Sequence, residues 1–410
     1  MQQLTDASLV TDVFGRAFVL FDSVNELFEL ELAYLESKTL SCDELVCRSA
    51  FFKAVNGELT NHYRLCQSST RAGAQKRTAQ VQAYFEEGKY STGYATHGLF
   101  PYRGKFHPQL VKGLLNILSV KPGETVIDPM CGSGTLNVEA SLLGIHSFAA
   151  DISPFCRFMT RVKCQSLSLP AELVKAMPHG AEKWFNYFST GSLNGKLKRI
   201  KDDDKLKVYE LALLAYLDAM GYARRVTKSS HRELFEKVLQ RYQNTVLQTI
   251  ANPVVRDSAL GKVEVLEGEA RALAIPDSSV DCVITSPPYS FAIDYAENDA
   301  PQLEYLGHNV DDLRVNMLGL AGKTKSEKLR RYFDDMEIVV REIVRVLKPQ
   351  KFAVLIIGSN TNQTGGIRLE QTIINHFEQA HAPLVRSILK PIKGMWNTMK
   401  DEYLLFFQKK

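Results

Sequence analysis

The sequence predicts an α/β fold: a seven-stranded doubly wound sheet with a helical N-terminal region and a helical insertion. From about residue 105 onward, short apolar runs of strand length alternate with amphipathic runs of helical period. One of these strands ends in a glycine-rich turn that opens a helix. Phe352–Ile357 is a continuous apolar run, which is typical of a strand buried on both faces of a parallel sheet. Strands that alternate with helices in this way favour a doubly wound sheet.

Composition excludes several other classes of protein. The chain has 410 residues, of which 45% are hydrophobic and 23% charged, and this excludes global disorder and fibrous repeats. Its seven cysteines include no CxxC pair, so we expect reduced thiols and no metal site. The longest apolar runs are too short to span a membrane, and the N-terminus lacks the pattern of a signal peptide. We therefore expect a cytoplasmic protein with no membrane partner.

Residues 1–95 are predicted to form the helical N-terminal region. The first 46 residues carry nine acids and two bases, whereas residues 47–90 carry seven bases and three acids. The basic half is either a solvated face of a helical cap or a surface that lies beside a polyanion. Six apolar residues recur mostly at spacings of three, four and seven, which indicates one helix face: Phe14, Phe18, Phe21, Leu27, Phe28 and Leu35.

Residues 96–164 and 261–410 together are predicted to form the α/β domain. A clear amphipathic helix is expected at Arg331–Leu347, with an apolar face that includes Met336 and Val340. Shorter helices are expected at Phe106–Leu118 and Leu136–Leu143. The seven strands are expected at Glu124–Asp128, His146–Ile152, Val263–Leu266, Val280–Ser286, Phe352–Ile357, Leu384–Leu389 and Tyr403–Phe407.

Residues 165–260 interrupt the alternation and are predicted to form a helical insertion that recognises the substrate. Val208–Met220 and His231–Leu247 have helical periodicity. The insertion carries fifteen bases and ten acids, a net charge of +5. Three bases before the second of these helices form either a solvated basic face or a phosphate-binding surface: Arg224, Arg225 and Lys228.

The first candidate site is the glycine-rich turn Asp128-Pro129-Met130-Cys131-Gly132-Ser133-Gly134-Thr135. It follows a strand and opens a helix, where backbone N–H groups face polar or anionic ligand atoms. Gly132 and Gly134 have the spacing of a dinucleotide fingerprint, although Asn137 stands in place of the third glycine. The strand before and the helix after favour a ligand-binding loop over an ordinary tight turn.

Two acidic residues follow the next two strands. Asp151 comes about 20 residues after the glycine turn, where an acid commonly binds the hydroxyl pair of a ribose. Ile152 would then lie against an adenine face, whereas the alternative for Asp151 is a helix cap or a turn. Glu269, in Gly268-Glu269-Ala270, is either an acceptor for an adenine amino group or a plain surface glutamate.

The run Thr285-Ser286-Pro287-Pro288-Tyr289 ends the fourth strand. Two consecutive prolines cannot continue a strand ladder, so they fix an extended backbone at the carboxyl end of the sheet, where α/β proteins bind ligands. Ser286 before them supplies a hydrogen-bonding group, and Tyr289 after them supplies a stacking surface. This pair suits a flat substrate that bears an amino group.

These elements together resemble the amino-group methyltransferases that use S-adenosylmethionine. DPMCGSGT is similar to the cofactor motif of that family, with Met130 where phenylalanine is commoner. SPPY is similar to the catalytic motif of enzymes that methylate exocyclic amino groups of bases. The run Thr96–Phe106 is similar to the segment that packs over the methionine end of the cofactor. The resemblance covers residues 96–164 and 261–410, and it implies a seven-stranded Rossmann-like methyltransferase sheet.

The resemblance also implies a role for each candidate residue. The turn that ends in Thr135 would bind the cofactor, and Ser286, Pro287, Pro288 and Tyr289 would be catalytic. The methionine side of the cofactor would be lined by Lys105, Phe106, Asp128, Gly132 and Gly134, and the adenosine side by Asp151, Ile152, Glu269 and Ala270.

The first residue of SPPY separates the possible substrates. An opening serine is more typical of N4-cytosine DNA methyltransferases, whereas aspartate or asparagine is more typical of N6-adenine enzymes and of RNA guanine-N2 enzymes. We therefore expect a site-specific DNA methyltransferase of the restriction–modification type, with DNA favoured over RNA as the partner. The alternatives are an RNA base N-methyltransferase, an N6-adenine DNA methyltransferase, and a nucleic-acid-binding protein that keeps the cofactor fold without turnover.

Overall fold

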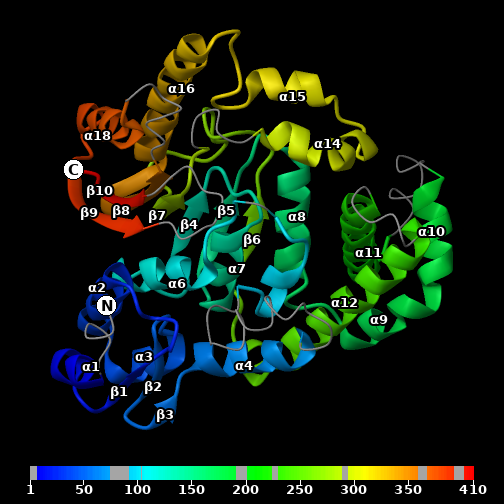
Figure 1. The fold of residues 1–410 in the computed structure, drawn as a ribbon, viewed down its shortest axis with the longest axis horizontal. Coiled ribbons are helices and arrows are strands. Elements are labelled where there is room, and N and C mark those ends of the chain that lie inside the picture. Colours follow the sequence, from blue (N-terminus) through cyan, green and yellow to red (C-terminus); the bar gives the residue numbers. More distant parts are fainter. Residues whose placement is uncertain are drawn as a thin grey trace. The chain divides into compact units, whose positions relative to one another are not determined.

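The computed structural model describes residues 7–73, 92–102, 104–190, 201–223, 230–288, 294–358, 367–391 and 401–410. The chain, which Figure 1 colours along its sequence, divides into two compact units. The first unit consists of residues 1–120, 138–144 and 162–260, and the second of residues 121–137, 145–161 and 261–410.

The second unit is built on a seven-stranded sheet with the strand order β6-β5-β4-β7-β8-β10-β9. The strands from β4 to β8 pair in parallel, and β10 runs antiparallel to both of its neighbours. Each strand falls where the sequence predicts it, which confirms the seven-stranded α/β fold. The strands are β4 (Thr125–Asp128), β5 (His146–Ala149), β6 (Val263–Val265), β7 (Val280–Thr285), β8 (Leu347–Gly358), β9 (Leu384–Pro391) and β10 (Asp401–Gln408).

The strand order reverses direction between β4 and β7. From β4 the chain adds β5 and β6 on one side, and it then returns to add β7 and β8 on the other side. Adjacent parallel strands end at the same edge, so the carboxyl ends of β4 and β7 are neighbours, with Val126 opposite Cys282 in the register. Doubly wound sheets bind their ligands at this switch point.

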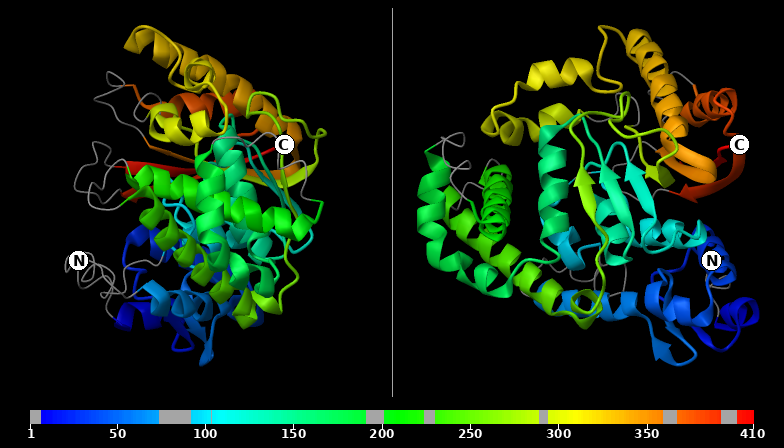
Figure 2. Two further views of the ribbon diagram at one scale, coloured as in Figure 1. Left: turned by 90° about the vertical axis from the view of Figure 1, so that its right-hand side faces the viewer. Right: turned by 180° about the vertical axis from the view of Figure 1, so that it is seen from behind.

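The core of the second unit lies between the sheet and two helices, α16 (Lys325–Val346) and α18 (Leu369–Gln379). The predicted inner face of α16 is confirmed, because Met336 and Val340 are both fully buried. The rings of Phe377 on α18 and Phe407 on β10 stack with 3.8 Å between their centroids. Burying one such large apolar side chain contributes roughly 1.5–3 kcal/mol. The link from β7 to α16 contains α14 (Tyr295–Tyr305) and α15 (Val310–Asn316), and Figure 2 shows these helices from two further sides.

Two helices follow the first two strands of this sheet. α7 (Thr135–Leu142) follows β4, and α8 (Pro154–Gln165) follows β5. Each helix begins in the second unit and continues into the first. They are therefore covalent links between the units.

The N-terminal part of the first unit contains a small sheet that the sequence analysis missed. β1 (Phe18–Leu20), β2 (Phe52–Val55) and β3 (Glu58–Leu59) form an antiparallel sheet. The predicted single helix face is therefore wrong, because Phe18 lies in a strand and Phe21 in the loop after it. The helices in this part of the unit are α1 (Ala7–Phe14), α2 (Leu27–Thr39), α3 (Cys42–Arg48), α4 (Asn61–Gly73), η2 (Ala95–Gly98) and α6 (Pro108–Ile117).

The insertion is helical, as predicted, and it belongs to the same compact unit as the N-terminal residues. α12 contacts both α4 and η2, and it runs beside α11 (Figures 1 and 2). α12 begins with a capping box, in which the Ser230 hydroxyl accepts from the Glu233 amide and the Glu233 carboxylate accepts from the Ser230 amide. The helices are α9 (Ala171–Ala176), η3 (Met177–Gly180), α10 (Ala181–Ser189), α11 (Asp203–Ala223), α12 (His231–Ala251) and α13 (Pro253–Arg256).

No helix in the described part of the chain is long and apolar enough to cross a membrane.

Candidate active site

The ends of β4 and β7 are joined by a buried hydrogen bond. Asp128, the last residue of β4, is 1% exposed, and its Oδ1 accepts from the hydroxyl of Thr285 (2.7 Å) and from the amide of Met130 (3.1 Å). Thr285 is the last residue of β7. The glycine turn after β4 and the Ser286-Pro287-Pro288 run after β7 therefore begin side by side at one edge of the sheet. Sequence analysis identified both segments but not Thr285 as the residue that links them.

The environment of Asp128 changes its acidity. Burial raises the pKa of the Asp128 carboxyl to about 7, although the hydrogen bonds from Thr285 and Met130 oppose the change. The nearby Asp151 carboxylate adds a smaller rise. Two acidic side chains thus lie near each other at this edge, and a cationic ligand placed beside them would stabilise their charged forms.

The backbone of the turn requires glycine at two positions. Gly132 and Gly134 have φ angles of +48° and +72°, in the left-handed region that L-residues seldom adopt. A Cβ atom on Gly134 would also come within 2.7 Å of Cγ2 of Thr160, on α8. The Thr160 hydroxyl donates to the Gly132 carbonyl (3.3 Å). The turn therefore lies against α8 and leads into α7 at Thr135, which is buried.

Asp151, just after β5, holds the glycine turn from the other side. Its Oδ2 accepts from the Gly132 amide (2.9 Å), and its Oδ1 accepts from the Ser153 amide (2.8 Å). Burial raises the pKa of Asp151, and these two bonds offset part of the rise. Asp151 thus has the structural role that the sequence analysis gave as its alternative, because its carboxylate stabilises a turn of the backbone. Each carboxylate oxygen has a second lone pair, so the same residue can accept from two ribose hydroxyls.

Arg157 is a second residue that the sequence analysis missed. Its Nη1 donates to the carbonyls of Asp151 (2.6 Å) and Ile152 (3.3 Å), and its Nη2 forms an ion pair with Glu267 (2.8 Å). It therefore fixes the loop in which the predicted adenosine-binding residues lie. A signal was present in the sequence, because a base in the first turn of a helix opposes the helix dipole and calls for nearby acceptors.

Glu269 is paired within the protein. Both of its carboxylate oxygens accept from Nε of Arg271, at 2.8 and 3.0 Å. Arg271 also donates to the Asp335 carboxylate (2.9 Å) and to the Asn316 carbonyl (2.8 Å). Glu269 is thus one member of an ion-pair network that holds the loop after β6. Its predicted contact with an adenine amino group, beside the buried Ala270, stays a prediction.

Of the other residues predicted to bind cofactor or substrate, some lie in the second unit and some in the first, and four lie outside the described residues. In the second unit, Ser286 and Pro288 are half-buried and Pro287 is buried, directly after β7. In the first unit, the Lys105 ammonium donates to the carbonyls of Thr92 (3.0 Å) and His97 (3.3 Å). Burial lowers the pKa of Lys105 to about 8. Phe106, Lys105 and the Ser286–Pro288 run keep their roles as predictions. Tyr289, Arg224, Arg225 and Lys228 lie outside the described residues.

Two further bases of the insertion, which follow the predicted phosphate-binding surface in the sequence, have acidic partners. Arg232 pairs with Glu236 (3.1 Å) and with Glu182 (3.2 Å). Arg241 pairs with the buried Asp218. Their charges are therefore partly neutralised within the protein.

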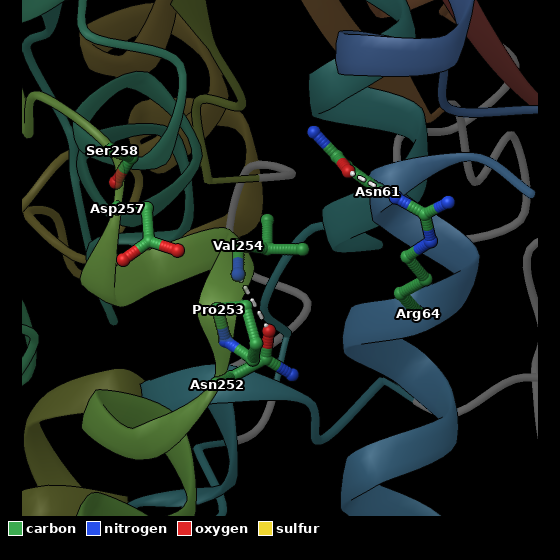
Figure 3. A pocket seen from close by; sticks show the side chains of 7 residues that line it. All are labelled: Asn61, Arg64, Asn252, Pro253, Val254, Asp257 and Ser258. Atoms are coloured by element: carbon green, nitrogen blue, oxygen red, sulfur yellow. Dashed lines mark hydrogen bonds between the residues drawn. The ribbon is translucent and has the colours of Figure 1, made fainter.

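The first unit also contains a hollow of about 510 Å³. Figure 3 shows Asn61 and Arg64 of α4 on one side and the α13 segment on the other. The Asn252 side chain in this hollow accepts from the Val254 amide (2.9 Å) and so caps α13. The lining combines polar and apolar side chains and contains none of the predicted cofactor-binding or catalytic residues. It consists of Asn61, Arg64, Asn252, Pro253, Val254, Asp257 and Ser258.

Residues 99–306, half of the chain, match the model of the UPF0020 family, described as an RMKL-like methyltransferase domain. The chain belongs to this family of methyltransferases. The matched range includes the glycine turn, Asp151, Glu269 and SPPY. The switch-point geometry described above is therefore that of a methyltransferase domain.

Three curated relatives are similar to parts of the chain. Type II methyltransferase M.BsoBI of Geobacillus stearothermophilus is 26% identical over 318 residues, which cover 61% of this chain and 62% of that protein. Type II methyltransferase M.MjaII of Methanocaldococcus jannaschii is 33% identical over 145 residues, or 29% and 27% of the two chains. A tRNA (guanine(10)-N2)-dimethyltransferase of Methanothermobacter thermautotrophicus is 40% identical over 53 residues, or 13% and 16%. The chain thus spans less than two thirds of the length of each.

Proposed function

We propose that the chain transfers a methyl group from S-adenosylmethionine to an exocyclic amino group of a nucleic-acid base, namely N4 of cytosine in DNA. One observation carries the proposal: the glycine turn and the Ser286-Pro287-Pro288 run begin at adjacent strand ends, which the Thr285–Asp128 hydrogen bond ties together. Direct transfer requires that the donor and the acceptor be held side by side, and such positioning supplies much of the rate.

The residues around the turn fit this cofactor. Asp151 has acceptor capacity for the two ribose hydroxyls. The N–H groups at the start of α7 would face polar atoms of the ligand. Two carboxyl groups at one edge, Asp128 and Asp151, favour a cationic ligand. When bound, S-adenosylmethionine supplies an electrophilic methyl group on a positively charged sulfur.

The SPPY run is suited to hold the acceptor. An aromatic amine is a poor nucleophile because its lone pair is delocalised into the ring. Acceptors at the Ser286 hydroxyl and the Pro287 carbonyl would bind the amino protons and favour a pyramidal nitrogen, and Tyr289 would stack on the base. A general base is not required before transfer, because the product ammonium is acidic. A paired base would first be flipped out of the duplex.

The choice of DNA rests on the opening serine of SPPY and on the similarity to type II methyltransferases. The tRNA (guanine(10)-N2)-dimethyltransferase supports a second candidate, an RNA base N-methyltransferase, over a much shorter range. Both candidates share the cofactor and the exocyclic amino group, so they differ in the polymer and the base.

The test is incubation of the protein with labelled S-adenosylmethionine and either DNA or RNA, followed by mass analysis of the nucleosides. The proposal expects N4-methylcytosine from DNA. Tyr289→Ala should reduce this product while Tyr289→Phe, which keeps the aromatic ring, retains it. Methylated guanosine from RNA would favour the second candidate. N6-methyladenine from DNA would show that the target base is adenine and not cytosine. If 5-methylcytosine is the sole product, amino methylation is wrong.

A further inference from the structure

A buried charged network surrounds Glu139, in the middle of α7. Glu139 is fully buried, and its Oε1 accepts from the Tyr94 hydroxyl and from Nε2 of His97 (2.7 Å). Its Oε2 lies 3.3 Å from the ammonium of Lys112, which is 4% exposed. Lys112 in turn lies 3.2 Å from Nδ1 of His62. All five residues belong to the first unit.

The protonation of this network follows from its burial. Burial alone would raise the pKa of Glu139, but the Lys112 charge and the His97 hydrogen bond outweigh it and lower the pKa to about 2. Burial lowers the pKa of His97 to about 4 and that of His62 well below its usual range. At neutral pH both histidines are therefore uncharged, so Nε2 of His97 donates to Glu139 and Nδ1 of His62 accepts from Lys112.

A buried charged network is not required for α7 to pack in the core, because apolar side chains would serve that purpose. A buried ion pair contributes little net stability compared with apolar side chains of the same volume, because both charges lose their hydration. Yet the removal of one partner is strongly destabilising, since it leaves the other charge unpaired. The network is therefore better explained by the definite arrangement that it enforces on the segments it joins.

The segments that it joins include the helix of the glycine turn. Glu139 comes four residues after Thr135, so it lies about one helical turn after the start of α7, and it comes five residues after Gly134. Tyr94 and His97 belong to a tight turn in which Ala95 has a φ angle of +47°, a strained value for a residue with a side chain. The His97 carbonyl also accepts from Lys105. One carboxylate thus fixes α7 relative to the turn at residues 94–98.

We propose that Glu139 is a positioning residue for the cofactor: through Tyr94, His97 and Lys112 it fixes α7, and thereby the glycine turn at the start of that helix. The proposal rests on the proposed function, because it assigns S-adenosylmethionine to this turn. Glu139 itself does not touch the cofactor. Its loss should therefore weaken cofactor binding more than it slows the chemical step.

The test compares Glu139→Gln with Glu36→Gln, a matched control in the same unit. Glu36 is also fully buried, and it accepts from the Ala50 amide (2.8 Å) and from the Asn116 side chain (2.7 Å), on elements other than α7. Calorimetry with S-adenosylmethionine is carried out at a temperature where thermal melts show that both variants are folded. Glu139→Gln should raise the dissociation constant about tenfold, with a smaller change in kcat at saturating cofactor, whereas Glu36→Gln should leave the constant unchanged.

A second substitution that restores cofactor affinity distinguishes the effect of an unpaired charge from a general loss of packing. Adding Lys112→Met to Glu139→Gln removes the unpaired ammonium and keeps the aliphatic stem, so the double variant should recover part of the lost affinity. Wild-type affinity in Glu139→Gln, or an equal loss in Glu36→Gln, would overturn the proposal.

A milder pair of variants serves if Glu139→Gln does not fold. Tyr94→Phe removes one donor to Glu139 and leaves the ion pair with Lys112 in place. Its control is Tyr332→Phe, because the buried Tyr332 hydroxyl has no hydrogen-bond partner in the part of the chain that is described. Tyr94→Phe should weaken cofactor binding and Tyr332→Phe should not; equal affinities would reject the role of Glu139. If the wild-type protein itself does not bind S-adenosylmethionine, the proposed function fails first, and this proposal fails with it.

Discussion

Thr285 and Asp128 lie 157 positions apart in the chain, yet the hydroxyl of the first donates to the carboxylate of the second across 2.7 Å. This bond joins the carboxyl ends of the two strands between which the sheet reverses its order. It couples the loop assigned to the cofactor with the loop assigned to the base. The two halves of the proposed reaction thus share one buried contact.

Thr285→Val should uncouple the two loops with little change in side-chain volume. The Asp128 carboxyl would lose a donor in a buried place, which costs about 1–3 kcal/mol of unfolding free energy. Methyl transfer should fall by about tenfold or more, whereas Thr285→Ser, which keeps the hydroxyl, should retain most of it. Urea unfolding and single-turnover rates measure the two effects. Equal rates in the valine and serine variants would contradict the coupling.

Asp151→Ala should weaken the binding of S-adenosylmethionine by about 1.5–3 kcal/mol, the value of hydrogen bonds to a charged acceptor. The variant also removes the acceptor for the Gly132 and Ser153 amides, so its melting temperature must be measured in parallel. Asp151→Asn keeps one carbonyl acceptor and should fall between the alanine variant and the wild type. Calorimetry that gives unchanged affinity in a folded alanine variant would remove Asp151 from the site.

The raised pKa of Asp128 makes stability depend on pH. The pKa is about 7 in the fold, compared with an ordinary value of 3.8, so the fold favours the protonated form. The contribution of this group to stability is fully present below pH 3.8 and is lost as the pH rises through 7. Asp128→Asn, which cannot ionise, should therefore be more stable than the wild type at pH 8 by up to about 4 kcal/mol. Thermal melts between pH 4 and 8 test this, and a constant difference across that range would be the contrary result.

Gly134→Ala should destabilise the protein by two separable effects. The left-handed backbone costs roughly 1–2 kcal/mol for a residue with a side chain. The new Cβ would also clash with Thr160. Gly123→Ala is the matched control, because Gly123 has a φ angle of +84° but nothing within 4 Å of the added atom. A larger loss of unfolding free energy at Gly134 than at Gly123 measures the close approach of the turn to α8, and equal losses would refute it.

Replacement of Arg224, Arg225 and Lys228 with alanine should weaken nucleic-acid binding for every sequence. The slope of log affinity against log salt should decrease by about 0.9 for each lost contact to a duplex phosphate. Cofactor affinity should not change. A control triple variant removes the same charge from bases that are paired with neighbouring acids: Lys175, Lys205 and Arg256. If the two triple variants have the same slope, the predicted surface does not bind phosphate.

The sheet could be predicted because each strand is a short apolar run with a helix or a turn beside it, as at Val280–Thr285. The role of Thr285 could not be predicted, because its hydrogen bond to Asp128 depends on the register between two strands that are distant in sequence. The three-residue strand at Phe18–Leu20 was hidden for another reason: a short apolar run fits helix and strand periods equally well. Glu139 acts through side chains from other segments, and single-sequence periodicity carries no information on these partners.

The joint packing of the insertion and the N-terminal residues has a consequence for any chimaera built to test the predicted recognition role of the insertion. The hydroxyl of Tyr242, on α12, accepts from the amide of Phe100 (2.8 Å) and donates to Asp218 on α11. Phe100 has a φ angle of +51°, so its conformation depends on such support. A chimaera that exchanged the insertion alone would leave this amide without its acceptor. The exchangeable module is therefore discontinuous in sequence, and a graft that respects it must carry the N-terminal residues together with the insertion.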